Sequence, residues 1–145
     1  MPHRRPQRGG RGDAAAPLRP ARVDEKHLDS LGLLWETVID GTCRWLLIHN
    51  YQVPAGYAPR MVMLALLIPP TYPTAQIDMF YTGPKLTLTS GRPIDRTQVA
   101  ATICGTPFNG WSRHRGPPAP WNPATDNVIT HLALVESAIA KEVGQ

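Results

Sequence analysis

Cys104 and a short run of basic residues behind it are the side chains of this sequence best suited to chemistry. Gly105 follows the cysteine directly, and Arg113, His114 and Arg115 come within the next eleven residues. The thiolate is the reactive form of cysteine, and a neighbouring imidazolium or guanidinium makes it available by lowering the thiol pKa. The glycine leaves room for an incoming chain terminus. Cys104 is therefore a candidate nucleophile.

Other residues of the same segment can assist such a nucleophile. His114 can act as a general base or donate a hydrogen bond to an oxyanion, and Asn109 is a second candidate for that donor. Trp111, in a glycine-flanked stretch, can form one wall of a groove. We expect Cys104 to lie partly exposed in a loop, with His114 touching it directly or through one water. Two alternatives stay open: Cys104 can be a small buried hydrophobe, and His114 can have no role in function.

The remaining cysteine and several aromatic side chains are interpreted as structural. Cys43 sits beside a predicted turn, where a place in the core or at the turn edge is expected. His49 and His131 fall at a strand end and on a helix, where packing or capping is the commoner role. Trp35 and Trp45 have apolar neighbours, so we expect them in the core.

Turn signals and apolar runs predict the elements that position these residues. A short helix is expected at 24–32, with acidic residues at its start and Gly32 at its end. Four strands are expected at 34–39, 43–49, 61–68 and 77–81, and Asp40-Gly41 after the first strand is a hairpin signal. The third run is almost wholly apolar, so it should be a central strand.

The second half of the chain is expected to be irregular before it ends in a helix. From 82 to 120 there is no lasting periodicity and there are many glycines and prolines, which predicts a long irregular segment carrying the candidate site. Asn122 is the expected N-cap of the following helix, with Pro123 as its first residue. Its apolar face is expected at Val128, Leu132, Val135 and Ile139. This order predicts an α+β fold built on a four-stranded antiparallel meander.

Charge divides the chain into two parts. The 145 residues carry a net charge of +4, but residues 1–22 hold six arginines against Asp13 alone, so the remainder is nearly neutral. We therefore expect a disordered Arg-rich tail at 1–22 and one folded domain at 23–145. The tail can attract nucleic acid or an acidic protein surface, or it can be an extension with no specific partner.

Several functional classes are excluded by what the sequence lacks. No apolar run reaches the roughly 18 to 20 residues that cross a bilayer, and the arginines at the start are not followed by an apolar signal segment. No phosphate-binding glycine loop, His-Glu-x-x-His helix or Gly-x-Ser-x-Gly elbow occurs. The spacing of the two cysteines fits neither a disulfide framework nor a structural zinc site. We expect a cytoplasmic protein with free thiols and neither metal nor cofactor.

Several runs together resemble the ubiquitin-conjugating-enzyme (UBC) superfamily, and more closely its prokaryotic family E. Pro69 to Pro73 read Pro-Pro-Thr-Tyr-Pro after the third predicted strand, Ile103-Cys104 lies in the irregular segment, and Trp121 to Pro123 read Trp-Asn-Pro. Further runs similar to family E lie at 31–37, 45–49, 53–57, 78–81, 111–114 and 130–132. The resemblance covers the chain from about residue 24 to its end. Two features depart from the wider superfamily: the His-Pro-Asn run is missing at 83–89, and Cys104 lies 17 residues before Trp121.

The resemblance implies a UBC-like fold and a function in conjugation. It implies that Cys104 accepts a ubiquitin-like protein as a thioester from a ThiF-like activating enzyme and passes it on, with a JAB-type peptidase as a further partner. The groove would be formed by Tyr72, Trp111, Arg113 and Trp121, the last of which also reads as a core residue. The alternative is an inactive UBC-fold adaptor that binds the ubiquitin-like protein or the activating enzyme. Nucleic-acid binding would come only through the tail.

Overall fold

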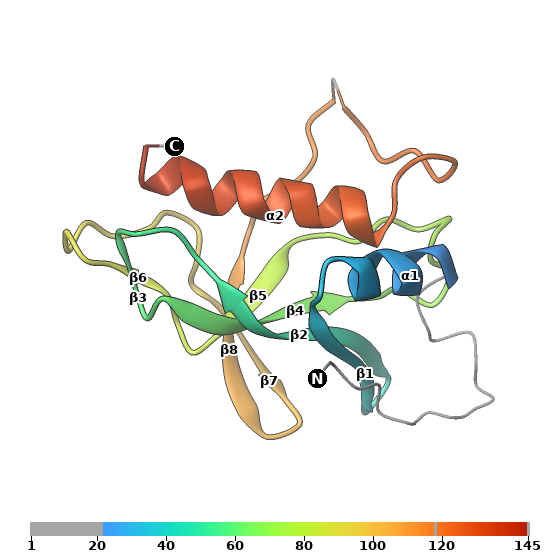
Figure 1. The fold of residues 1–145 in the computed structure, drawn as a ribbon, viewed down its shortest axis with the longest axis horizontal. Coiled ribbons are helices and arrows are strands. Elements are labelled where there is room, and N and C mark those ends of the chain that lie inside the picture. Colours follow the sequence, from blue (N-terminus) through green and yellow to red (C-terminus); the bar gives the residue numbers. More distant parts are fainter. Residues whose placement is uncertain (1–21, 118, 145) are drawn as a thin grey trace.

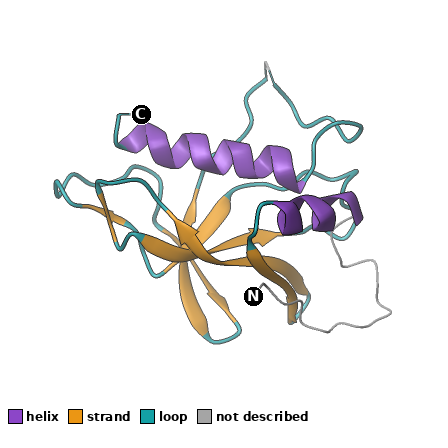
Figure 2. Ribbon diagram, in the orientation of Figure 1, coloured by secondary structure: helices purple, strands orange, loops and turns teal. Residues whose placement is uncertain are grey.

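The computed structural model describes residues 22–117 and 119–144, and in this part of the chain two helices lie on one side of an antiparallel sheet (Figures 1 and 2). The α+β class is therefore confirmed. In chain order the elements are α1 (Arg22–Ser30), β1 (Leu34–Asp40), β2 (Cys43–Gln52), β3 (Tyr57–Ala58), β4 (Met61–Leu67), β5 (Phe80–Gly83), β6 (Thr87–Leu88), β7 (Val99–Ile103), β8 (Thr106–Trp111) and α2 (Val128–Glu142).

The sheet has six strands in the order β1-β2-β4-β5-β8-β7, and β3 pairs with β6 in a separate two-stranded sheet. Strands β1, β2, β4 and β5 of the large sheet pair antiparallel in this order, and β3 lies between β2 and β4 in the chain. The prediction of only four strands is nevertheless incomplete, because β8 pairs with β5 and β7 with β8. The fourth strand also begins at Phe80, three residues later than expected.

The stretch 82–120 is not one irregular segment, which corrects the prediction made from its glycines and prolines. It contains β6 and the hairpin of β7 and β8. Pro107 lies within β8 opposite Thr102. Because Ile103 and Thr106 flank a two-residue turn, they form a hydrogen-bonded pair, and Thr102 and Pro107 form the next, non-hydrogen-bonded one. The missing N–H of Pro107 therefore leaves the ladder intact.

The core is divided between the two faces of the sheet. On the helix face, Leu28 of α1 and Val135 of α2 pack with Trp35, Phe80 and Trp111, and the last two rings stack at 5.2 Å between centroids. On the opposite face, a smaller buried cluster consists of Trp45, Leu47, Ala65, Ile103 and Phe108. The β7–β8 hairpin contributes two of these side chains, so it covers the sheet on the side away from the helices.

Both helices lie near their predicted places, but α2 begins later than expected. α1 starts two residues before the predicted helix and is followed by Gly32 in the left-handed conformation, with φ of 71°. Asn122 does not cap α2, because its side chain and carbonyl accept from N–H groups of residues 124–126 and close a separate turn. Asn127 is the N-cap, and Thr130 completes a capping box with it. The buried face is Val128, His131, Val135 and Ile139.

The predicted tail at 1–22 lies outside the described residues except for Arg22, where α1 begins. Among the described helices, none combines the length and the apolar character needed to cross a bilayer.

Candidate functional site

Cys104 lies at the tip of the β7–β8 hairpin and is exposed. Ile103 and Thr106 are paired on either side of it, so Cys104 and Gly105 form a two-residue turn. Both have positive φ, 49° for Cys104 and 83° for Gly105, as the type I′ turn requires. The expected exposed position in a connecting segment is confirmed, although the segment is a tight turn between strands rather than a long loop.

The turn conformation is unfavourable for Cys104. A residue with a Cβ atom in the left-handed region is destabilised by about 1–2 kcal/mol, and asparagine, aspartate and glycine are the residues that this turn position prefers. A cysteine therefore stands where the backbone favours another residue. Strained backbone of this kind concentrates at functional sites.

The surroundings of Cys104 are acidic. Its backbone N–H donates a hydrogen bond of 2.7 Å to Oδ2 of Asp40, at the end of β1, and Glu36 lies on the same strand. Partial desolvation of the thiol, then the charge of Asp40 and then that of Glu36 raise the pKa of Cys104 above its usual value. The thiol form therefore predominates at neutral pH, contrary to the cationic activation expected from the sequence.

His114 does not contact Cys104, and the prediction that it would is wrong. Its Nδ1 atom lies 2.8 Å from Oδ1 of Asp78, and both side chains are about half exposed. The six residues of β8 separate Cys104 from His114, and at about 3.3 Å per residue their strand is about 17 Å long. Cys104 and His114 therefore lie near opposite ends of one strand. They are close in sequence but far apart in space because the chain between them is extended.

Asn109 and Arg113 are held by backbone carbonyl groups away from the thiol. Asn109, near the middle of β8, donates from Nδ2 to the carbonyl oxygen of Thr97 at 3.5 Å. Arg113 donates to the carbonyl oxygens of residues 95 and 96, and its Nη2 lies 3.5 Å from Oε2 of Glu142. Its guanidinium also lies over the ring of Trp111, 5.0 Å from the centroid. Arg113 thus links α2 to the segment that precedes β7.

Trp111 belongs to the core, with 1% of its surface exposed, so the expectation that it walls a groove is not met. Tyr72 joins the helices, because its hydroxyl donates to Oδ2 of Asp24 at 2.5 Å and accepts from the N–H of Val128 at 2.9 Å. Trp121 is half-buried against Tyr72, and its Nε1 donates to the carbonyl oxygen of Pro73.

A group centred on His131 was not predicted as part of a site. His131 is buried and its Nε2 lies 2.7 Å from the carbonyl oxygen of Met79, which can only accept, so Nε2 carries the proton. Its Nδ1 then accepts from Nη2 of Arg115 at 3.5 Å, and Arg115 stacks on Trp121. Burial chiefly lowers the pKa of His131. The spacing of His131 by one helical turn from Val128 and from Val135 indicates that it is buried. That spacing gives no sign of the contacts with Met79 and Arg115.

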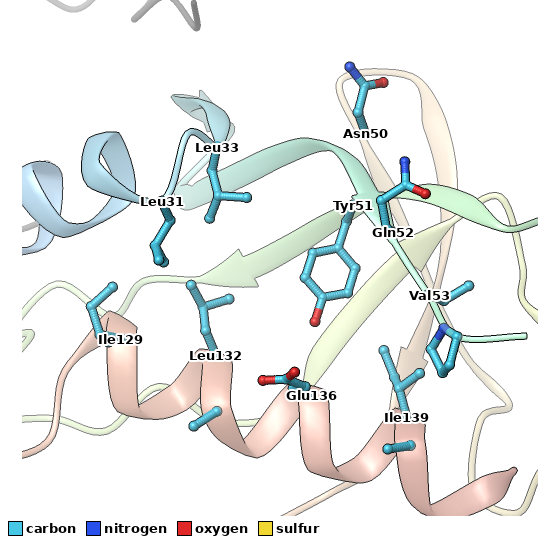
Figure 3. A pocket seen from close by; sticks show the side chains of 13 residues that line it. Leu31, Leu33, Asn50, Tyr51, Gln52, Val53, Ile129, Leu132, Glu136 and Ile139 are labelled. Atoms are coloured by element: carbon cyan, nitrogen blue, oxygen red, sulfur yellow. The ribbon is translucent and has the colours of Figure 1, made fainter. Parts of the chain in front are cut away.

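Two grooves lie beside α2. One of about 370 Å³ runs between residues 112–114 and the C-terminal half of α2, and Arg96 and Lys141 are among its lining residues. The other, of about 710 Å³, is mostly apolar and lies between α2, the α1–β1 connection, the end of β2 and the two residues that follow it (Figure 3). Tyr51 points into it toward Glu136. Burial, and then the charge of Glu136, raise the pKa of Tyr51 to about 12.

The chemistry available to this arrangement is limited. Cys104 offers an exposed nucleophile, but neither His114 nor Asn109 reaches it, and a carboxylate occupies its backbone N–H. Within the described residues, no group of three or more His, Cys, Asp or Glu side chains is placed to hold a metal ion. Such a thiol can receive and carry an acyl group.

Comparison with models of known protein families gives a match to this chain. The model of a family described as prokaryotic E2 family E matches residues 21–142, nearly the whole chain. Neither the curated proteins nor the solved structures contain a match.

Proposed function

Because this chain belongs to prokaryotic E2 family E, we propose that it receives a ubiquitin-like protein as a thioester on Cys104 and passes it on. The family supports a UBC-like conjugating role, and with it an interaction with an activating enzyme and a ubiquitin-like protein in general. We further propose that a ThiF-like activating enzyme is the donor and Cys104 the acceptor.

One observation carries the choice of residue. Cys104 is exposed at a turn tip in a backbone conformation that disfavours cysteine, while Cys43, the other cysteine of the chain, is half-buried at the start of β2. Retaining a reactive side chain at an unfavourable backbone position is the pattern expected where function sets the residue type. A turn tip also leaves the thiol open to two large proteins in succession.

The acidic surroundings of Cys104 favour a thioester that is held for longer and is not discharged rapidly. The Cys104 thiolate attacks the carbonyl carbon of the incoming thioester, a new C–S bond forms, and the former carrier leaves as a thiolate that takes up a proton. A thiol with a raised pKa is the poorer leaving group, so its thioester is displaced more slowly. His114 and Asn109 take no direct part in this step, because neither lies at the thiol.

The test is a charging reaction with the activating enzyme, the ubiquitin-like protein and ATP, separated on gels with and without reductant. We expect a reductant-sensitive adduct on the wild-type chain and none on Cys104→Ala. Cys104→Ser should give an adduct that resists reductant, since an ester replaces the thioester. Cys43→Ser is the matched control and should charge normally. An adduct that persists on Cys104→Ala and is lost on Cys43→Ser would transfer the role to the other cysteine.

The adaptor function is the second candidate, and it is favoured because no cationic side chain contacts Cys104 among residues 22–117 and 119–144. In that case the chain holds the ubiquitin-like protein or the activating enzyme while another protein carries the thioester. The same gels distinguish the two, because an adaptor binds its partner in a pull-down but forms no adduct. Cys104→Ala would then bind as tightly as the wild type.

A further inference from the structure

β7 is a terminal strand of the large sheet, and its outer side has no strand partner among residues 22–117 and 119–144. The register with β8 decides which backbone groups face outward. Val99, Ala101 and Ile103 are the hydrogen-bonded positions, since Ile103 flanks the two-residue turn. The N–H and C=O groups of Ala100 and Thr102 therefore point away from β8, toward an incoming strand.

The side chains of β7 leave this edge open. The strand reads Val-Ala-Ala-Thr-Ile and has neither charge nor proline, the two features that usually protect an edge strand from pairing. Val99, Ala100 and Thr102 are exposed. The opposite edge of the sheet, β1, carries Glu36 and Asp40. The sheet thus has one charged edge and one uncharged edge.

The uncharged edge leads directly to the thiol. The carbonyl group of Ile103 faces β8, so in a trans peptide the N–H of Cys104 must point the opposite way, to the same side as Ala100 and Thr102. The carboxylate of Asp40 accepts from this N–H at 2.7 Å. An acceptor oxygen already lies where the carbonyl oxygen of an added strand would be.

We propose that the extended C-terminal tail of the ubiquitin-like protein binds as a strand parallel to β7 and thereby delivers its last carbonyl carbon to Cys104. This inference rests on the proposed function. The parallel direction is required, because an antiparallel tail would place its C-terminus beside Val99. Addition of a strand to an exposed sheet edge is a common mode of peptide recognition.

The pairing fixes which groups of the tail are used. In a parallel ladder the third residue from the end of the tail donates its N–H to the C=O of Ala100 and accepts with its C=O from the N–H of Thr102. The last residue of the tail then donates its N–H to the C=O of Thr102. The carbonyl oxygen of that last residue then accepts from the N–H of Cys104, displacing Asp40. Serine proteases use the N–H of their nucleophile in the same way, as an oxyanion donor. The penultimate residue points its N–H toward solvent.

The covalent step is a thioester exchange without net oxidation or reduction. The sulfur of Cys104, having lost its proton to solvent, attacks the last carbonyl carbon of the tail. The oxyanion that forms is held by the Cys104 N–H, and it collapses by breaking the bond to the sulfur of the former carrier. That sulfur leaves as a thiolate and recovers a proton from solvent.

A synthetic tail tests the docking without the natural partner. The probe is acetyl-Thr-Val-Thr-Val-Gly-Gly as an aryl thioester, incubated with the full chain, and transfer to Cys104 is followed by intact mass. N-methylation of the second valine, the third residue from the end, should slow transfer about tenfold, since it removes a ladder bond and blocks strand approach. N-methylation of the penultimate glycine should change the rate less than twofold. Equal slowing by both would overturn the proposal.

A matched pair of protein variants gives the reciprocal test. Thr102→Pro removes the outward N–H without touching the bonds to β8, as Pro107 already does across the ladder, so the hairpin should remain folded. Transfer from the probe should fall about tenfold, whereas alkylation of Cys104 by iodoacetamide should stay at the wild-type rate. Thr102→Val keeps the N–H and should behave as wild type.

The outcomes separate this inference from the proposed function. One outcome is that Thr102→Pro charges on Cys104 at the wild-type rate both with the probe and in the complete enzymatic reaction. That result rejects the β7 edge as the docking place and leaves the proposed role of Cys104 as thioester carrier standing. Failure of the wild type to charge in the complete reaction rejects both. If the wild type charges in the complete reaction but not from the probe, Thr102→Pro is tested in the complete reaction. An unchanged rate there again rejects the β7 edge as the docking place.

Discussion

Replacing Cys104 with asparagine should make the protein more stable while abolishing its capacity to carry an acyl group. Cys104 occupies the first central position of a type I′ turn, with φ of 49°. Asparagine tolerates this left-handed conformation far better than cysteine does, because its short amide can bond to the local backbone. The thiol is exposed, so its removal sacrifices little apolar burial.

The magnitude follows from the backbone conformation. A residue with a Cβ atom is destabilised there by about 1–2 kcal/mol, and asparagine relieves part of that strain, so we expect a gain of about 1 kcal/mol in the free energy of unfolding. For a domain of this size the gain corresponds to a rise in melting temperature of about 4 °C. The slope of the urea transition should not change, because the same surface is exposed on unfolding.

The assay is urea unfolding at pH 7, followed by the fluorescence of the buried tryptophans. Cys104→Ala is the matched control: it removes the thiol but keeps a Cβ atom in the strained conformation, so it should be as stable as the wild type. Cys104→Val, which is branched at Cβ, should be less stable than either. Equal gains from alanine and asparagine would show that the thiol, and not the turn, is the source of the strain.

Three further changes test other contacts. Tyr72→Phe removes the hydroxyl that joins α1 to the start of α2 and should lower the free energy of unfolding by about 1–3 kcal/mol in a urea titration, and an unchanged midpoint would contradict this. Because the pKa of His131 is lowered in the folded state, the unfolded chain takes up the proton at a higher pH than the folded chain does. The free energy of unfolding should therefore fall as the pH drops below about 6.5, and His131→Gln should weaken this dependence on pH. Alkylation of Cys104 should reach its maximal rate only above the usual thiol pKa, and Asp40→Asn should shift that profile to lower pH; identical profiles would exclude Asp40 as a cause.

Local sequence patterns were sufficient for the elements that carry strong signals. The Asp40-Gly41 pair marked the β1–β2 hairpin, and the apolar run at 61–68 marked β4, because both signals depend on neighbouring residues alone. The β7–β8 hairpin was missed because Cys104-Gly105 stands where Asn-Gly or Asp-Gly is the usual signature. Pro107 also argued against a strand, and only the register shows that it lies at a harmless position.

The exposure of Cys104 could be predicted from the sequence, but the arrangement of the side chains around it could not. That Cys104 would be exposed followed from the glycine beside it, whereas its partner Asp40 is 64 residues away in sequence. His114 was paired with the nearest reactive side chain, but its true partner, Asp78, is 36 residues away on the approach to β5. Such contacts depend on how the sheet curls, which local periodicity does not encode. The start of α2 was misplaced because two asparagines compete as cap, and the capping box with Thr130 favours Asn127.

The bond between Asp40 and Cys104 makes the thiol a reporter of how the sheet moves. It joins the tips of two hairpins that have no other pairing with each other among the described strands, and it lies at the surface, so it can open while both buried clusters stay packed. Each opening separates the thiol from a carboxylate and so speeds its reaction with a small electrophile. The kinetics of labelling at this single atom would therefore measure the frequency with which the two hairpin tips part, and any protein that docks between them would be detected as a change in that frequency.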